Sequence, residues 1–151
     1  AVPCDALAAT MNPLFLAAFI ERTGRTSETV DAMLVASPLP GEPPLPLHEI
    51  EDGDHPRIVY ARRRRDEVRA WETQGGVLVT GRGIAGRLEV SVEVEEGVRH
   101  RGLGGALVAA ARHLGEEPLW AQVAPGNARS MRAFQAAGYL PVGSEALLIA
   151  R

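Results

Sequence analysis

The sequence has a single cysteine, Cys4, few aromatic side chains and no long apolar run. One cysteine excludes an internal disulfide and a cysteine-based metal cluster, and we expect no metal site. The apolar stretch from Leu14 to Ile20 is too short to cross a bilayer, and Glu21 and Arg22 follow it at once. The opening AVPCDALAAT lacks the basic segment of a secretory signal. We therefore expect a cytoplasmic protein with no membrane partner.

The chain also lacks a strong net charge. It has 16 basic and 19 acidic side chains, and a formal charge of −3. Proteins that hold nucleic acid electrostatically carry a broad basic field, so we expect no nucleic-acid partner. The run Arg62 to Arg65 is a local exception, but Asp66 and Glu67 follow it, which favours a solvated face. A length of 151 residues with ordinary hydrophobic content predicts one globular domain, residues 1–151.

The first part of the chain carries weak structural signals. Residues 5–24 have helical spacing and end at Gly24, whereas residues 28–36 fit either a helix or a short strand. Residues 37–46 contain five prolines and predict an irregular crossing. Pro56 suits the first turn of a short helix that reaches the arginine run.

The second part carries clearer signals. Residues 67–81 predict two strands around a turn, and residues 88–95 alternate strictly between apolar and polar, as a half-buried strand does. Apolar residues recur with helical spacing over 103–114, PLWAQVAP predicts a short strand, and residues 128–137 predict a helix closed by Gly138. One or two strands are expected at the end of the chain. Residues 88–124 therefore predict a βαβ crossover with two parallel strands.

A glycine-rich loop, VRHRGLGGAL from Val98 to Leu107, joins that strand to the helix. The first backbone N–H groups of a helix have no intrahelical acceptor and carry partial positive charge. Glycines let a phosphate approach these groups closely, and Arg99, His100 and Arg101 can supply countercharge. The loop taken alone is equally compatible with a plain turn whose glycines satisfy positive φ angles.

The details of the loop exclude two nucleotide-binding motifs. A P-loop closes with Gly-Lys-Ser/Thr, whereas this chain has Gly105-Ala106-Leu107. A dinucleotide fingerprint needs a third glycine at position 107 and an acidic residue near the end of the next strand. This chain has Leu107 and, on the next strand, Gln122 and Ala124.

A third pattern matches. Arg99-His100-Arg101-Gly102-Leu103-Gly104 resembles the Arg/Gln-x-x-Gly-x-Gly/Ala signature of the GNAT superfamily, the acyl-CoA-dependent N-acyltransferases. Val94 stands five residues before Arg99, where that family has a strand valine. After the second parallel strand, APGNARSMRAFQAAGYLPVG resembles the family's second motif, with Asn127, Ser130, Phe134 and Gly138-Tyr139 in order. The resemblance covers residues 66–151, the expected acetyl-CoA-binding core, well, and residues 1–50, a helical N-terminal part, poorly.

The resemblance implies a mixed α/β (α+β) GNAT-like fold. Its sheet would be mostly antiparallel, with two splayed parallel strands around the βαβ unit and helices on both faces. Acetyl-CoA would be the co-substrate, with its pantetheine arm along the backbone of Val92 and Val94. Asn127 would contact the pantetheine, although it also suits a helix N-cap and the two roles are compatible, and Ser130 would lie near the cofactor. The pyrophosphate would be held by the N–H groups of Arg99, His100, Arg101, Gly102, Leu103, Gly104 and Gly105.

The implied activity is acetyl transfer from acetyl-CoA to a primary amine, by direct attack with both substrates bound. The amine must first lose a proton, which requires a base or a water wire. Glu89, Glu93 and Glu95 share one face of a strand, where mutual repulsion favours proton uptake by one of them, and Glu93 lies nearest the expected thioester. The same three residues also fit an ordinary polar outer face.

Phe134 occupies the position at which many members of the family have a tyrosine as general acid. Phenylalanine has no proton to give, so Tyr139, Tyr60 or water must substitute, or the thiolate must leave unprotonated. The alternative function is a non-catalytic acyl-CoA-binding sensor. The sequence does not specify the amine acceptor, a small molecule or a peptide, and it leaves open whether the chain forms a homodimer.

Overall fold

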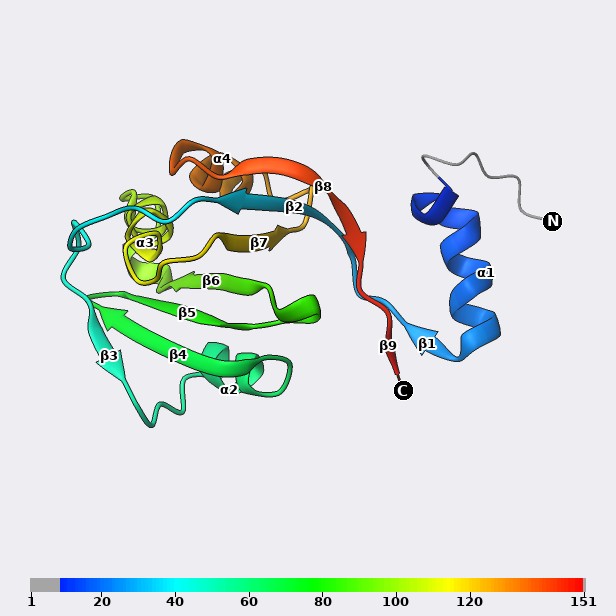
Figure 1. The fold of residues 1–151 in the computed structure, drawn as a ribbon, viewed down its shortest axis with the longest axis horizontal. Coiled ribbons are helices and arrows are strands. Elements are labelled where there is room, and N and C mark those ends of the chain that lie inside the picture. The colour runs from blue at the N-terminus through cyan, green and yellow to red at the C-terminus, as the bar shows by residue number, and fades with distance from the viewer. Residues whose placement is uncertain (1–8, 151) are drawn as a thin grey trace.

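The computed structural model describes residues 9–150. Cys4 and the start of the helix expected over residues 5–24 lie outside the described residues. A seven-stranded sheet in the order β3-β4-β5-β6-β7-β2-β8 forms the centre of the fold (Figure 1). Its strands are β2 (Val30–Ala36), β3 (His48–Ile50), β4 (Asp66–Thr73), β5 (Gly76–Arg82), β6 (Leu88–Val94), β7 (Leu119–Val123) and β8 (Leu140–Ala146).

Neighbouring strands of this sheet are antiparallel except for β6 and β7, which run parallel. The helix that connects this pair is α3 (Leu103–Ala111), so the predicted βαβ crossover is confirmed. Regular α-helix ends at Ala111 rather than at Leu114. The next three N–H groups bond three residues back instead, for example Leu114 N to Ala111 O at 3.1 Å, which tightens the last turn.

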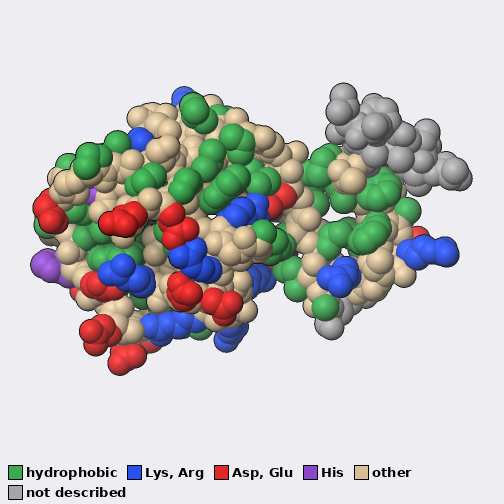
Figure 2. All heavy atoms as spheres, in the orientation of Figure 1, with side chains coloured by type: hydrophobic (Ala, Val, Ile, Leu, Met, Phe, Trp, Pro, Cys, Tyr) green, Lys and Arg blue, Asp and Glu red, His purple; other side chains and the backbone are tan. Residues whose placement is uncertain are grey.

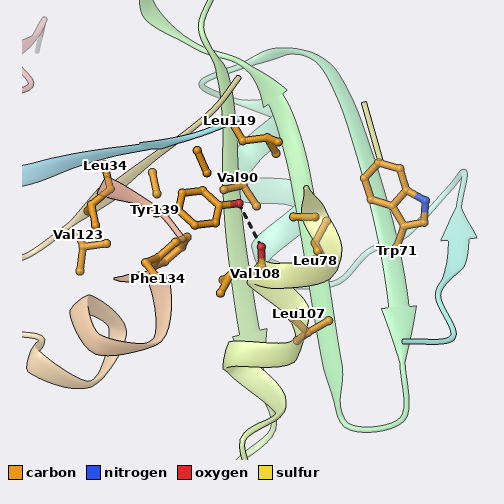
Figure 3. Close-up of a cluster of buried hydrophobic side chains, with 13 residues drawn as sticks. Leu34, Trp71, Leu78, Val90, Leu107, Val108, Leu119, Val123, Phe134 and Tyr139 are labelled. Atoms are coloured by element: carbon orange, nitrogen blue, oxygen red, sulfur yellow. Dashed lines mark hydrogen bonds between the residues drawn. The ribbon is translucent and has the colours of Figure 1, made fainter. Parts of the chain in front are cut away.

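Helices cover both faces of the sheet. On one face, Ile58 and Ala61 of α2 (Pro56–Arg62) pack against Ala70 of β4 and Val79 of β5. On the opposite face, α3 and α4 (Ala128–Ala136) cover the larger cluster (Figure 3). Alternate residues of a strand point to opposite faces, so the next residues along β4 and β5 belong to this second core. Its members larger than alanine are Leu34, Trp71, Leu78, Val90, Leu107, Val108, Leu119, Val123, Phe134 and Tyr139.

The segment 28–36, which fitted a helix or a strand, contains strand β2. It lies between β7 and β8 and is antiparallel to both. Both edges of its backbone are therefore paired, and Leu34 and Ala36 are buried. The N-terminal part is thus only partly helical, because it contributes an interior strand of the sheet, next to the edge strand β8.

The helix predicted to stop at Gly24 is α1 (Pro13–Thr23). Asn12 caps its start, and Gly24 ends it with a φ of 64°. After the short 3-10 turn η1 (Ala9–Met11), α1 lies apart from the large sheet, beside a two-stranded sheet of β1 (Arg25–Thr26) and β9 (Ile149–Ala150) (Figure 1). No described helix is both long and apolar enough to span a membrane.

The arginine run at the end of α2 divides into two parts. Arg62, Arg63 and Arg64 are exposed, as predicted for a solvated face. Arg65 differs, because its side chain is only 14% exposed and forms an ion pair with Glu89. On the face drawn in Figure 2, acidic and basic side chains alternate over the lower part of the main body, and hydrophobic side chains gather over its upper part.

Candidate functional site

A pocket of about 1120 Å³ opens where β6 and β7 separate. The two strands pair only at Leu88–Leu119 and Glu89–Trp120. Beyond these pairs, β6 continues to Val94 beside β5, whereas β7 continues beside β2. The facing edges of the two strands therefore have no strand partner where they line the pocket, and their N–H and C=O groups can bind an extended ligand. Val94 O already accepts a hydrogen bond from Arg99 Nε at 3.1 Å.

The glycine loop forms one wall of this pocket. Gly102, with a φ of 82°, immediately precedes α3 and has no side chain to cap it. The N–H groups of Leu103, Gly104 and Gly105 precede the first intrahelical bond, which joins Ala106 N to Gly102 O at 3.0 Å. They are free to bind an anion.

Space in the loop differs from one glycine to the next. A Cβ on Gly104 would touch Val94 Cγ2 at 3.6 Å, an ordinary contact, and a Cβ on Gly105 would meet nothing within 4 Å. His100 has a positive φ of 69°, which is uncommon for a residue with a side chain. The loop backbone thus takes the left-handed conformation at His100 and again at Gly102, beside the pocket.

Helix α4 forms the opposite wall. Asn127 Oδ1 accepts a hydrogen bond from Ser130 N at 3.1 Å, so Asn127 is the N-cap of α4, and both residues line the pocket. Arg129 and Arg132 also line it and add positive charge. Sequence reasoning missed these two arginines, although they are three residues apart and therefore lie near one another on the helix.

The structure brings most of the predicted site residues to this one pocket. Arg101 does not line it, although it belongs to the loop signature. Glu93 lines it, whereas Tyr139 does not. The predicted cofactor-binding residues in its lining are Val92, Val94, Arg99, His100, Gly102, Leu103, Gly104, Gly105, Asn127 and Ser130.

The polar face of β6 differs from an outer face of three like charges. Glu93 Oε2 accepts from Arg57 Nε at 3.0 Å, and Glu89 is only 7% exposed and paired with arginine. Two of the three carboxylates are therefore neutralised by neighbours, which removes the mutual repulsion expected from the sequence alone. Sequence reasoning missed Arg57 because it comes from α2, 36 residues before its partner.

Glu89 is the centre of a buried polar network. Its oxygens accept from Arg65 Nε at 2.9 Å and from Gln122 Nε2 at 2.8 Å, and Arg87 Nη2 lies 3.7 Å away. Arg87 also donates to Glu145 at 2.9 Å. Burial lowers the pKa of Arg65, and the Glu89 carboxylate opposes this shift. Within residues 9–150, no three His, Cys, Asp or Glu side chains gather as a metal-binding group.

Tyr139 belongs to the core. It is fully buried, and its hydroxyl donates to Val108 O at 3.1 Å (Figure 3). Its ring meets that of Phe134 edge to face, with centroids 5.0 Å apart. Burial raises the pKa of the phenol. These contacts oppose the proton-transfer role expected for Tyr139, because the hydroxyl is buried and bonded to a backbone carbonyl, Tyr139 does not line the pocket, and its proton is held more tightly.

Phe134 lines the pocket with 6% of its surface exposed, so it presents an apolar wall at the position where a proton donor was sought. The other tyrosine, Tyr60, lies on α2 beneath the Arg64 guanidinium and lines a different, small hollow. Neither tyrosine lines the large pocket.

The described architecture resembles two solved structures. A GCN5-related N-acetyltransferase from Sphaerobacter thermophilus aligns with a TM-score of 0.50 and 16% identity, over 90% of this chain and 56% of that one. The fold is GNAT-like. This GNAT-like chain also aligns with an X-ray structure of a Drosophila protein, with a TM-score of 0.60 and 14% identity, over 99% of this chain and 59% of that one.

These similarities confirm the expected fold class, a mixed α/β fold with a mostly antiparallel sheet and helices on both faces. The chain spans less than two thirds of the length of either solved structure. No protein-family model matches the sequence, and no curated protein matches it significantly. Function therefore has to be argued from the site itself.

Proposed function

We propose that the GNAT-like chain is an N-acetyltransferase that moves an acetyl group from acetyl-CoA to a primary amine. The observation that supports it most strongly is the pocket between β6 and β7. It combines unpaired strand edges with the free N-terminal N–H groups of α3. An amide-bearing arm ending in a pyrophosphate has the chemistry that these two features can bind.

The residues present fit such a ligand. Leu103, Gly104 and Gly105 offer backbone donors, and the absence of atoms within 4 Å of a Cβ on Gly105 leaves room for close approach. Arg99 lines the pocket on the loop side, and Arg129 and Arg132 line it on the α4 side, so an anion finds cations on both sides. Val92 and Val94 would flank the pantetheine arm, and Asn127 would contact it through its side-chain amide nitrogen, since Oδ1 already caps α4.

Acetyl transfer also requires two proton transfers. Acetyl-CoA supplies the acyl group: the amine nitrogen bonds to the acyl carbon as the carbon–sulfur bond breaks. One ammonium proton leaves before attack and a second ends on the thiol. Glu93 is the proposed acceptor of the first proton, because it lines the pocket and is 40% exposed. The apolar Phe134 implies that the second proton passes from nitrogen to sulfur through water, either as the thiolate leaves or after its departure.

The test begins with calorimetric titration of CoA into the wild type and two glycine variants. Gly105→Glu places a carboxylate among the phosphate donors, and we expect the Kd for CoA to rise at least about tenfold through like-charge repulsion. Gly143→Glu is the matched control, since it adds the same charge on β8, outside the pocket lining, at a position where a Cβ meets nothing within 4 Å. Equal CoA binding by Gly105→Glu and wild type would contradict the proposed cradle.

Turnover is then measured as thiol release over a panel of amines. The sequence contains no lysine, so thiol release cannot arise from acetylation of a lysine in the chain itself. Acceptor-dependent release supports the transferase. Tight CoA binding without thiol release for any amine would favour the alternative function, an acyl-CoA-binding sensor. Two observations support that alternative: Phe134 has no proton to donate, and Glu93 is paired with Arg57.

A further inference from the structure

The guanidinium of Arg57 has unused hydrogen-bonding capacity at the pocket. Its Nε donates to Glu93 Oε2, and the hydrogen bonds found among residues 9–150 give its two terminal nitrogens no partner. The side chain is 36% exposed and lines the pocket. A guanidinium binds carboxylates best through two parallel N–H···O bonds. Arg57 can therefore take a second carboxylate without releasing Glu93.

Glu93 also has a hydrogen-bond acceptor that is not in use. One of its oxygens accepts from Arg57, and the other has no partner within the described part of the chain. The pair thus places a free anionic oxygen and a free cationic edge side by side at the pocket. A ligand with an ammonium group next to a carboxylate complements both at once.

The charged groups around Glu89 do not have this capacity, and the other arginines that line the pocket, Arg99, Arg129 and Arg132, are the proposed partners of the phosphates. Glu89 pairs with Arg65 and Arg87, and Arg87 also pairs with Glu145. Gln122 donates a hydrogen bond to the Glu89 oxygen that Arg65 does not occupy. The Glu89 network, which reaches the pocket through Gln122, is therefore balanced in charge rather than acidic. A polycationic acceptor finds no surplus of negative charge there, whereas a zwitterion finds one site of each sign.

We propose that the Arg57–Glu93 pair recognises the acceptor, and that the acceptor is a free amino acid. The acceptor carboxylate binds the terminal nitrogens of Arg57, and its ammonium group binds the free oxygen of Glu93. This inference rests on the proposed acetyltransferase function. It makes Arg57 a specificity residue and gives Glu93 the proton that the amine loses. A peptide N-terminus has a neutral amide in place of the carboxylate and lacks half of this recognition.

The test compares each standard amino acid with its α-carboxamide as acceptor, using the full chain with acetyl-CoA. For the best amino acid, we expect kcat/KM to exceed that of its carboxamide by about 10- to 100-fold, the range for one charge-assisted hydrogen-bonded contact at a half-exposed site. Arg57→Gln is expected to bring this ratio close to 1, because it removes the contact that only the acid makes. The control is Arg63→Gln, an exposed arginine at the C-terminal end of the same helix that does not line the pocket.

A second readout does not need turnover. Calorimetry of the best amino acid against the CoA-saturated protein is expected to show binding that Arg57→Gln weakens by a similar factor, with the melting temperature nearly unchanged. A purely structural role for the half-exposed pair would shift stability slightly and leave the acid-to-amide ratio intact.

The outcomes separate the two proposals. Equal use of acids and carboxamides by the wild type, or a ratio that survives Arg57→Gln, overturns amino-acid recognition and leaves acetyl transfer standing. Binding of CoA without amino-acid binding or acetylation also overturns it. A wild type that binds no CoA removes both proposals.

Discussion

Replacing Tyr139 with phenylalanine separates packing from catalysis at the one buried tyrosine. The variant keeps the ring, its edge-to-face contact with Phe134 and the core volume, and loses only the hydroxyl that donates to Val108 O. Removing a buried hydrogen bond costs about 1–2 kcal/mol of unfolding free energy. For a chain of this size, that corresponds to a fall in Tm of about 2–8 °C.

The same variant is expected to keep CoA binding and turnover within about twofold, because the hydroxyl lies outside the pocket lining. A lost proton donor would instead lower kcat by about 10²–10⁴-fold. Thermal unfolding and thiol release on the same preparation measure both quantities, and Tyr60→Phe is the control for an exposed tyrosine. An unchanged Tm with a collapsed kcat would refute the assignment of Tyr139 to the core.

Alkaline titration adds an independent check on Tyr139. Burial holds the folded-state pKa of this phenol above its unfolded value, so the folded state keeps the proton longer. The stability linked to Tyr139 is therefore fully present below the unfolded value of about 10 and is lost as the pH rises from there towards the folded pKa. Tyr139→Phe should lack this component of the loss.

Two further predictions concern stability. A Cβ on Gly83 would lie 2.2 Å from Glu89 Oε1, so we expect Gly83→Ala to displace that buried carboxylate and lower the unfolding free energy by about 1–3 kcal/mol in urea melts. Gly97→Ala is the control, because its Cβ meets nothing within 4 Å and stability should change little. Equal stability of the two variants would contradict the account of the Glu89 network. The Arg69 guanidinium holds the pKa of Glu49 below its usual range, so this pair contributes up to about 1 kcal/mol of stability above pH 4.5, which is lost as the pH falls through the folded pKa. In a plot of unfolding free energy against pH, Glu49→Gln should flatten the fall at acid pH. An unchanged fall would show that the pair contributes nothing.

Local patterns in the sequence predicted the elements whose period is unambiguous. The strict alternation over 88–95 corresponds to β6, and the helical spacing that ends at Gly24 corresponds to α1. Segment 28–36 could not be assigned because its conformation depends on β7 and β8, which pair with it from about 85 and 110 residues away in the chain. Tertiary pairing decides such short apolar runs.

The candidate site likewise has residues that the sequence predicts and residues that only the fold brings together. The loop and Asn127 lie in contiguous motifs, so their order along the chain was enough to group them. Arg57 and Gln122 reach the pocket only through the packing of α2 and the separation of β6 from β7. The alternation correctly placed Glu89 with Glu93, but only the structure shows that arginines from other elements neutralise both.

The central claim is that CoA binds between β6 and β7 with its pyrophosphate at the start of α3. The most direct measurement is an NMR titration of the ¹⁵N-labelled chain with CoA, followed by amide chemical shifts. The account predicts saturable shifts concentrated at Leu103, Gly104 and Gly105, with a second group along Val92 to Val94. Absence of saturable shifts, or shifts confined to the hollow beside Tyr60 and Arg64, would contradict it.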